Sequence, residues 1–216
     1  MNPDTTVFLI DDDASVRKGL KRLLHSSGYF VEAFESAEAF LNNSIPAGAG
    51  CVILDLRMPG VSGIELQQQL DTLNCKLPII FLSGHAGISD SVQAMKYGAV
   101  DFLTKPVDEK SLLASIDAAI DHQRQQLVVT SENDSFRQRV ASLTGRELET
   151  LQWVISGLRN KQIAAELGIT EKTVKVHRAR ILEKTATSSV AELVRLCTLT
   201  GIHPKTHTND SAIIPS

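Results

Sequence analysis

The first 120 residues alternate short apolar runs with segments of helical period. Strands of a parallel sheet are buried on both faces, so they read as continuous apolar runs, and a crossover helix separates each strand from the next. The pattern therefore predicts an α/β unit built on a five-stranded parallel sheet. The expected strands cover residues 7–10, 29–34, 51–54, 79–82 and 100–103.

A long helix is expected after the last strand, because Asp108 precedes a segment with apolar residues at helical spacing. From residue 121 the chain becomes polar and Gln-rich, without glycine or proline. We expect a partly helical linker over residues 123–141, with a break near residues 130–135. The first domain then covers residues 1–122, and the domain boundary lies in the linker.

Beyond the linker the apolar period is purely helical. Thr144 and Glu147 fit a capping box, as Ser62 and Glu65 do in the first domain. The pattern predicts an all-α domain of four helices over residues 142–202. A polar tail over residues 203–216 shows no period and is expected to be disordered. The first expected helix begins after Thr144 and ends near residue 157. The other three cover residues 160–167, about 171–184 and about 189–199.

Charge is shared unevenly between the two parts of the chain. The 216 residues have a formal net charge of -3. Residues 1–140 carry 12 Lys+Arg against 18 Asp+Glu, whereas residues 141–216 carry 10 against 7. An acidic part that suits a cation therefore precedes a basic part that suits phosphate backbones.

The sequence has no sign of export, membrane insertion or metal binding through cysteine. Its three cysteines are widely spaced and form no C-x-x-C pair, so neither a disulfide framework nor a zinc site is expected. The N-terminus MNPDTTVFLIDDD lacks a basic segment, and no apolar run approaches the length of a membrane helix. We therefore expect a cytoplasmic protein without a membrane partner.

Acidic side chains follow two of the expected strands. Asp11, Asp12 and Asp13 come directly after the first strand, and Asp55 ends the third. The carboxyl ends of parallel strands meet at one edge of a sheet, so these acids should converge there. Their mutual repulsion favours a hard cation, and Mg²⁺ commonly binds one or two carboxylates together with a phosphate.

The same edge is expected to receive a hydroxyl and an ammonium, because Ser83 ends the fourth strand and Lys105 follows the fifth. A carboxylate at Asp55 can act as a nucleophile and form an aspartyl phosphate, while Mg²⁺ and Lys105 neutralise charge on the phosphoryl group. Each feature alone is commonplace, since an acidic triplet is usually a solvated turn and a terminal serine usually a cap. Their joint placement favours a phosphoryl-transfer site.

Four motifs resemble the receiver domains of bacterial response regulators, over nearly all of residues 5–122. They are LIDDD at 9–13, ILDLRMPGVSGIEL at 53–66, FLSGHA at 81–86 and GAVDFLTKP at 98–106. The resemblance implies a flavodoxin-like (β/α)5 fold and assigns no role to Asp13. It implies Asp55 as the phosphoacceptor, Asp11, Asp12, Asp55 and the Arg57 backbone carbonyl as Mg²⁺ ligands, and Ser83 and Lys105 as phosphate contacts.

The resemblance also implies a switch and a dimer. Phe102 occupies the position of the family's switch aromatic, which turns inward when the Ser83 hydroxyl is drawn to the phosphate; its plain interpretation is a core phenylalanine. The Lys105–Pro106 bond is usually cis in this family. Residues 88–97, the fifth strand and the helix after Asp108 resemble the usual dimerisation face, so phosphorylation is expected to promote a homodimer.

Residues 160–179 read as helix, glycine turn, helix, with a basic outer face. Such a face is often merely solvated, but it can meet phosphates and base edges when the second helix enters a major groove. The stretch from about 142 to 199 resembles a LuxR-type helix-turn-helix domain, and its combination with a receiver resembles the FixJ and NarL group. The resemblance implies base contacts from Lys175 and Val176 and phosphate contacts from Lys161, Lys172, Thr173, Arg178 and Arg180, with His177 on the same face.

One hypothesis and two alternatives follow. In the hypothesis, the unphosphorylated receiver either masks the recognition helix or leaves the protein monomeric. Phosphorylation of Asp55 by a sensor histidine kinase then shifts the protein toward a dimer that binds a double-stranded DNA operator, with RNA polymerase as a further partner. The protein is then not an enzyme, although it takes the phosphoryl group onto its own Asp55 and loses it slowly. The first alternative is a Mg²⁺-dependent phosphohydrolase, whose nucleophile usually follows the first strand. The second is a DNA-binding protein with a degenerate receiver that no longer responds to phosphorylation.

Overall fold

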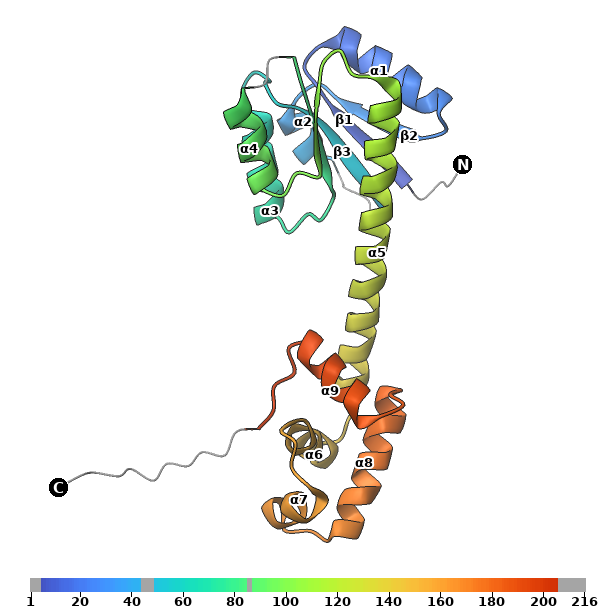
Figure 1. Ribbon diagram of the computed structural model, residues 1–216, viewed down its shortest axis with the longest axis vertical. Helices are drawn as coiled ribbons and strands as arrows, with labels where there is room; N and C mark the ends of the chain where they lie inside the picture. Colours follow the sequence, from blue (N-terminus) through green and yellow to red (C-terminus); the bar gives the residue numbers. More distant parts are fainter. Residues whose placement is uncertain (1–4, 44–48, 85–86, 206–216) are drawn as a thin grey trace, which may run out of the picture. The chain divides into compact units, whose positions relative to one another are not determined.

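The chain folds into two compact units, Met1–Leu127 and Val128–Ser216. The computed structural model describes residues 5–43, 49–84 and 87–205 of it (Figure 1). Within these ranges, no helix is both long enough and apolar enough to cross a membrane. The two units are described separately.

The first unit is built on one parallel sheet with the strand order β2-β1-β3-β4-β5 (Figure 1). This is the order of the flavodoxin-like topology, so the expected fold class is confirmed. Every expected strand is present, with its ends shifted by one or two residues. The strands are β1 Thr5–Ile10, β2 Phe30–Phe34, β3 Ala49–Asp55, β4 Ile79–Ser83 and β5 Asp101–Thr104.

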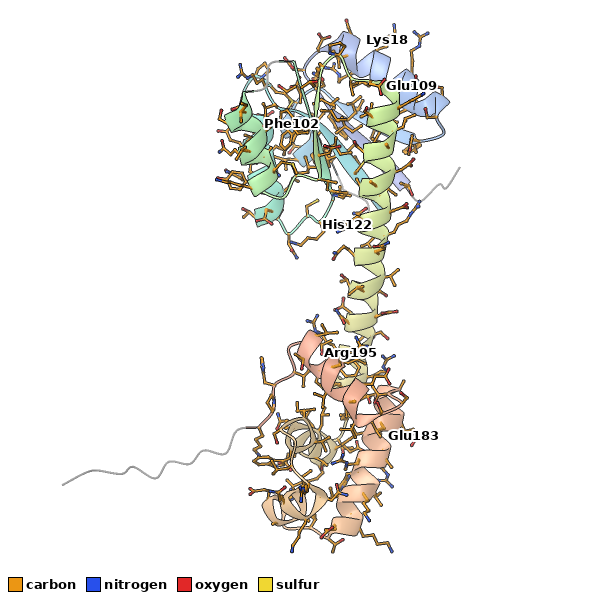
Figure 2. The ribbon with its side chains drawn as sticks, in the orientation of Figure 1. Lys18, Phe102, Glu109, His122, Glu183 and Arg195 are labelled. Atoms are coloured by element: carbon orange, nitrogen blue, oxygen red, sulfur yellow. The ribbon has the colours of Figure 1, made fainter. Side chains whose placement is uncertain are left out.

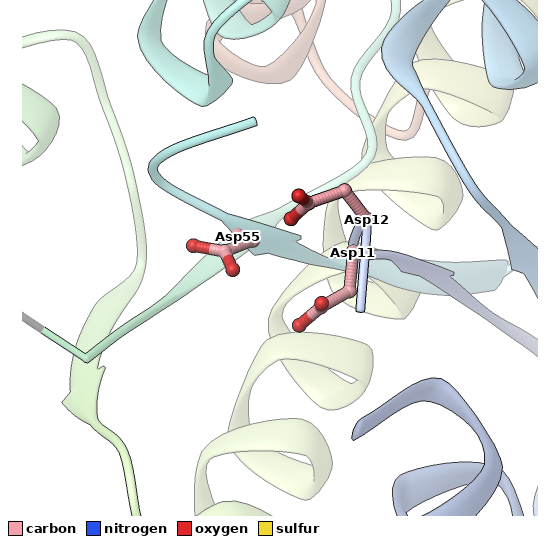
Figure 3. Close-up of side chains that lie close together, drawn as sticks. All are labelled: Asp11, Asp12 and Asp55. Carbon is pink, nitrogen blue, oxygen red and sulfur yellow. The ribbon is translucent and has the colours of Figure 1, made fainter. Parts of the chain in front are cut away.

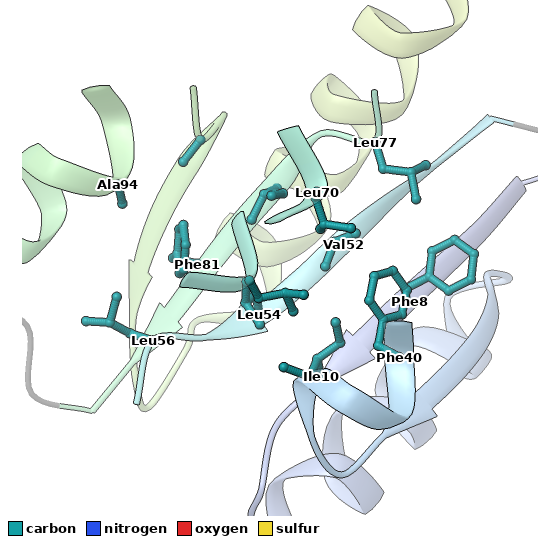
Figure 4. Packing of buried hydrophobic residues seen from close by; sticks show 14 of the residues in the cluster. Phe8, Ile10, Phe40, Val52, Leu54, Leu56, Leu70, Leu77, Phe81 and Ala94 are labelled. Carbon is teal, nitrogen blue, oxygen red and sulfur yellow. The ribbon is translucent and has the colours of Figure 1, made fainter. Parts of the chain in front are cut away.

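Helices cover both faces of this sheet. Successive side chains of a strand point to opposite faces, so Phe8 packs with α2, α3 and α4, whereas Leu9 packs with α1 and α5. Figure 4 shows the first of these cores, in which the buried ring of Phe40 lies beside Phe8 with 5.5 Å between ring centroids. The helices are α1 Ala14–Ser26, α2 Ala37–Leu41, α3 Gly63–Thr72, α4 Ile88–Lys96 and α5 Glu109–Ala141.

Helix α5 is continuous over 33 residues. The break expected near residues 130–135 is therefore wrong. The helix remains continuous because of residues further along it. Phe136 and Val140 are 0% and 7% exposed and belong to the core of the second unit. Burying side chains of this size stabilises the helix by roughly 1.5–3 kcal/mol each. The Ser, Asn and Asp residues before them each cost at most about 0.7 kcal/mol relative to alanine.

The earlier part of α5 is fixed to the amino edge of the sheet. The Gly50 N–H donates a hydrogen bond to Gln123 Oε1 at 2.5 Å, and the Arg124 guanidinium donates to the Thr5 hydroxyl at 2.9 Å. A Cβ atom at position 50 would overlap the backbone carbonyl of Thr6, so this close approach requires glycine. The last of these contacts from α5 lies at Arg124, two residues beyond the expected domain end.

The second unit contains the four expected helices, and the carboxyl end of α5 packs into its core. The core of this unit includes Leu151, Ile163 and Ile181, all nearly inaccessible to solvent. Gly168 ends α7 with a φ of 64°, a left-handed conformation that glycine adopts without strain. The helices are α6 Gly145–Ile155, α7 Asn160–Leu167, α8 Glu171–Thr185 and α9 Val190–Leu199.

The segment after α9 is held on α6. The Lys205 N–H donates to the Gln152 carbonyl at 3.3 Å, and the Lys205 ammonium lies 5.6 Å from the centre of the Trp153 ring. The tail that was expected to be disordered thus begins with ordered residues. Its greater part, residues 206–216, lies outside the described residues.

A buried carboxylate joins α6 to the end of α8. Glu147 is 2% exposed, and its Oε2 accepts hydrogen bonds from the Thr144 N–H at 2.9 Å and from Lys184 Nζ at 2.7 Å. The Lys184 ammonium first, and the Thr144 N–H next, lower the pKa of Glu147 from 4.5 to about 2. Since the folded state holds the ionised form, this stabilisation is complete above pH 4.5 and is lost as the pH falls toward 2.

We expect Glu147→Gln to lower the free energy of unfolding of the second unit by about 1–3 kcal/mol at pH 7, because a neutral amide at this buried position loses the charge-assisted bonds that the carboxylate accepts from Lys184 and Thr144. The acid-induced loss of stability between pH 4.5 and 2 should also become shallower. Trp153 is the one tryptophan of the sequence and lies in this unit, so its fluorescence during urea unfolding reports the change. Glu149→Gln is the matched control, because Glu149 lies on the same helix but forms only a solvent-exposed ion pair, with Arg146. An equal effect there would contradict the assignment.

Candidate functional site

The carboxyl ends of four strands lie on one edge of the sheet and carry the predicted site residues. Asp11 follows β1, Asp55 ends β3, Ser83 ends β4 and Lys105 follows β5. Asp11 is 0% exposed, Ser83 1% and Asp55 9%, while Lys105 is half-buried. Residues up to 94 positions apart in sequence therefore meet in one small volume.

Three carboxylates face one another at this edge (Figure 3). One oxygen from each of Asp11, Asp12 and Asp55 lies within 4.8 Å of the other two. Mg²⁺ binds oxygen at about 2.0–2.1 Å, so opposite ligand oxygens of a bound ion lie roughly 4.2 Å apart. The three carboxylate oxygens would fit the ion if they moved slightly closer together. Asp12 is exposed, which leaves water access on one side, as Mg²⁺ requires.

Lys105 bridges two of these carboxylates. Its Nζ donates to Asp11 Oδ2 at 2.6 Å and to Asp55 Oδ2 at 2.5 Å. Burial alone lowers the pKa of Lys105, but the hydrogen bonds and charges of Asp11 and Asp55 outweigh it and raise the pKa overall. Burial raises the pKa of Asp11 despite the Lys105 ammonium. Lysine thus remains protonated and offsets part of the carboxylate repulsion.

Asp13, for which the motif gave no role, supports the turn that holds these acids. It is the N-cap of α1, and its Oδ1 accepts hydrogen bonds from the N–H groups of Ser15 at 2.7 Å and Val16 at 3.2 Å. Arg17 Nη1 also donates to the Asp11 carbonyl at 2.7 Å. The aspartate directly before a helix was a readable capping signal that the sequence analysis missed.

The loop after β3 brings Arg57 to the same place. The Arg57 N–H donates to Asp55 Oδ1 at 3.1 Å. A Cβ atom at Gly63 would overlap the Asp55 carbonyl, so glycine lets α3 begin directly against the loop after β3. An open hollow at this edge is lined by Asp12, Asp13, Val16, Asp55, Arg57, Ser83, Gly84 and Lys105.

Two features implied by the resemblance can be located. The Lys105–Pro106 peptide bond is cis. Phe102 lies on β5, where Figure 2 labels it, and its half-buried ring stacks on Phe81 with 6.1 Å between ring centroids. In this conformation Phe102 is neither a fully buried core residue nor a free surface side chain.

The residues predicted to contact DNA lie on α7 and α8 of the second unit. Val174 and Ile181 face the core, which leaves the opposite face of α8 toward solvent. Lys161 is exposed on α7. On α8, the exposed members are Lys172, Lys175, Val176 and Arg180, and the half-buried ones are Thr173, His177 and Arg178.

Both units match known protein families. The family model described as "Response regulator receiver domain" matches residues 7–117, and that of the "Bacterial regulatory proteins, luxR family" matches residues 141–197. The transcriptional regulatory protein FixJ of Azorhizobium caulinodans is 40% identical over 92% of this chain and 94% of its own length. The response regulator protein TodT of Pseudomonas putida is 44% identical over 89% of this chain and 85% of its own.

Solved structures agree with this assignment. The response regulator StyR has 47% sequence identity and a TM-score of 0.78, covering 91% of this chain and 99% of its own. Full-length FixJ from B. japonicum has 39% identity and a TM-score of 0.56, covering 91% and 97%. The chain belongs to the response regulators that join a receiver domain to a LuxR-type DNA-binding domain. It is a two-component transcription regulator, and the phosphohydrolase alternative is not supported.

We expect Lys105→Met to bind Mg²⁺ about fivefold or more tightly than the unaltered protein, because the Lys105 ammonium bonds to two of the carboxylates that would hold the ion. Two like unit charges about 4 Å apart repel by about 1 kcal/mol even in water. Isothermal titration calorimetry without a phosphodonor measures this affinity. Lys110→Met removes an exposed lysine from α5 and should leave it unchanged. Weaker Mg²⁺ binding by the Lys105 variant would show that the ion does not share the carboxylates that Lys105 bridges.

Proposed function

We propose that a sensor histidine kinase phosphorylates Asp55 and that this step controls DNA binding by the second unit. The observation that carries the proposal is the bridge from Lys105 to Asp11 and Asp55, which gathers two carboxylates and an ammonium at the sheet edge. An Asp55 oxygen attacks phosphorus, the O–P bond forms, and the P–N bond to the donor imidazole breaks. The imidazole keeps that electron pair and takes up a proton.

The surrounding residues have distinct roles in this proposal. Asp11, Asp12, Asp55 and the Arg57 carbonyl hold Mg²⁺, which neutralises charge on the phosphoryl group when bound. When the phosphoryl group is present, one of its oxygens competes with the carboxylates of Asp11 and Asp55 for the Lys105 ammonium and accepts a hydrogen bond from it. The Ser83 hydroxyl, buried at the end of β4, binds another oxygen, and Phe102 turns inward into the space near it. The receiver loses the phosphoryl group slowly to water, without a substrate of its own.

Phosphorylation then favours a homodimer through α4 and β5. This face carries apolar side chains that are unusually open to water, with exposures of 86% for Ile88, 47% for Val92, 48% for Met95 and 49% for Tyr97. A second copy would cover them and so gain hydrophobic stabilisation. A dimer also presents two recognition helices to two half-sites of a double-stranded operator.

In the DNA complex, Lys175 and Val176 contact base edges, while Lys161, Lys172, Thr173, Arg178 and Arg180 contact phosphates and His177 lies beside them. RNA polymerase is the proposed further partner, and the cytoplasm the proposed location. We assign residues 1–122 to the receiver and 142–202 to the DNA-binding domain. Residues 123–141, within α5, connect the two.

We expect Asp55→Asn to abolish labelling by acetyl phosphate, because an amide cannot form the acyl phosphate. Intact mass and phosphate-affinity electrophoresis measure the label in the presence of Mg²⁺. Asp71→Asn, a change at an exposed carboxylate of α3, should label normally. Normal labelling of the Asp55 variant would assign the phosphoacceptor to another residue.

We expect Lys175→Ala to weaken operator binding by about 1–3 kcal/mol, roughly 5-fold to 150-fold, if Lys175 reads a base edge. Fluorescence anisotropy at fixed salt measures the affinity, and acetyl phosphate labelling of Asp55 should be unchanged. Lys172→Ala is the matched control, because loss of a phosphate contact weakens specific and nonspecific DNA binding alike. A uniform loss on both kinds of DNA with Lys175→Ala would contradict the base contact.

A further inference from the structure

The two ends of α4 are held very differently. At its carboxyl end, Gln67 of α3 donates from Nε2 to the carbonyls of Ala94 at 3.2 Å and Tyr97 at 3.1 Å. Gln67 is 3% exposed and Ala94 is 0% exposed, so the bond to Ala94 forms inside the core between the two helices, while the bond to Tyr97 lies at its edge. Buried amide-to-carbonyl hydrogen bonds are costly to break, which anchors this end of α4.

The amino end of α4 has no comparable support among the described residues. Its N-cap is Gly87, which offers no side chain to the first turn, whereas α3 begins with the capping box of Ser62 and Glu65. Ile88 is 86% exposed and adds little packing. The side-chain contact that ties this turn to the phosphoacceptor loop is the ion pair between Arg57 Nη2 and Asp90 Oδ2, at 3.5 Å.

Arg57 thus stands between Asp90 and the place where a phosphoryl group would form. Its side chain lines the hollow that also contains Asp55, Ser83 and Lys105, and with 69% exposure it has room to turn. Phosphorylation would bring about -1.5 to -2 charges and three acceptor oxygens. Guanidinium groups bind phosphate through paired hydrogen bonds, whereas Asp90 offers one long contact. The phosphoryl group is therefore the stronger partner, although Mg²⁺ and Lys105 take up part of its charge.

We infer that the Arg57 guanidinium contacts the phosphoryl group of the phosphorylated receiver, and that in doing so it leaves Asp90 and frees the first turn of α4. The inference rests on the proposed function, because it requires phosphorylation of Asp55. The freed turn moves about the anchor at Gln67. It carries Ile88 and Val92, so phosphorylation changes the apolar face that the receiver offers to a second copy.

Hydrogen exchange of the full-length protein, followed by mass spectrometry of peptides covering residues 88–92, tests this inference. Without phosphodonor, Asp90→Asn should exchange about twofold to fivefold faster than the unaltered protein, the range set by an exposed ion pair. With acetyl phosphate and Mg²⁺, at a protein concentration at which sedimentation shows the monomer, so that no second copy covers α4, the unaltered protein should reach the rate of the variant. The variant itself should show little further increase.

Two further variants separate the ion pair from general effects. Arg57→Gln without phosphodonor should speed exchange as much as Asp90→Asn does, and the double variant should show no more than either, because all three lack the same contact. Asp71→Asn is the matched control, since this exposed acid forms no ion pair among the described residues. Its exchange over residues 88–92 should equal that of the unaltered protein.

Phosphate-affinity electrophoresis of the same samples distinguishes failure of this inference from failure of the proposed function. If Asp55 is labelled normally but exchange over residues 88–92 is unchanged by phosphorylation, or additive in the double variant, the Arg57 inference is wrong and the proposed function stands. If the unaltered protein takes no label at Asp55, the proposed function fails and the inference falls with it.

Discussion

Repulsion among Asp11, Asp12 and Asp55 is the constraint on which the arrangement of the sheet edge depends. Parallel pairing of β1 with β3 brings these carboxylates to one edge, and burial raises the pKa of Asp11. The Lys105 ammonium offsets part of this repulsion by bonding to Asp11 and Asp55 together. A cation or phosphoryl group that enters this edge competes for the hydrogen bonds between Lys105 and the two carboxylates, so its binding changes these contacts.

The helix α5 contributes side chains to two hydrophobic cores. It belongs to the core of the first unit through Ile116 and Ile120 and to the core of the second through Phe136. The hydrogen bond from Gly50 to Gln123 fixes the point at which the helix leaves the sheet. One continuous helix therefore packs in both units, because its two ends are parts of two different hydrophobic cores.

Helix α4 provides the contrast, because it combines a firm end with a weak one. The buried side chain of Gln67 fixes the carboxyl end through two hydrogen bonds, whereas a long, exposed ion pair from Arg57 restrains the amino end. An exposed pair contributes little to stability, so it is poorly suited to holding a fold and well suited to being exchanged for a stronger partner. Arg57 belongs both to this weak contact and to the loop after Asp55, so the weakly held end of α4 lies next to the acidic sheet edge.

The sequence by itself determined the strands, the four helices of the second unit and the residues at the sheet edge. These features rest on local signals, such as apolar runs, the capping box at Thr144 and Gly168 after α7, and they are legible over a few neighbouring residues. Only the tertiary structure decided the continuity of α5, the buried pair of Glu147 with Lys184 and the contact of Arg57 with Asp90. Each depends on burial or proximity between residues distant in sequence, and local propensity contains no term for either.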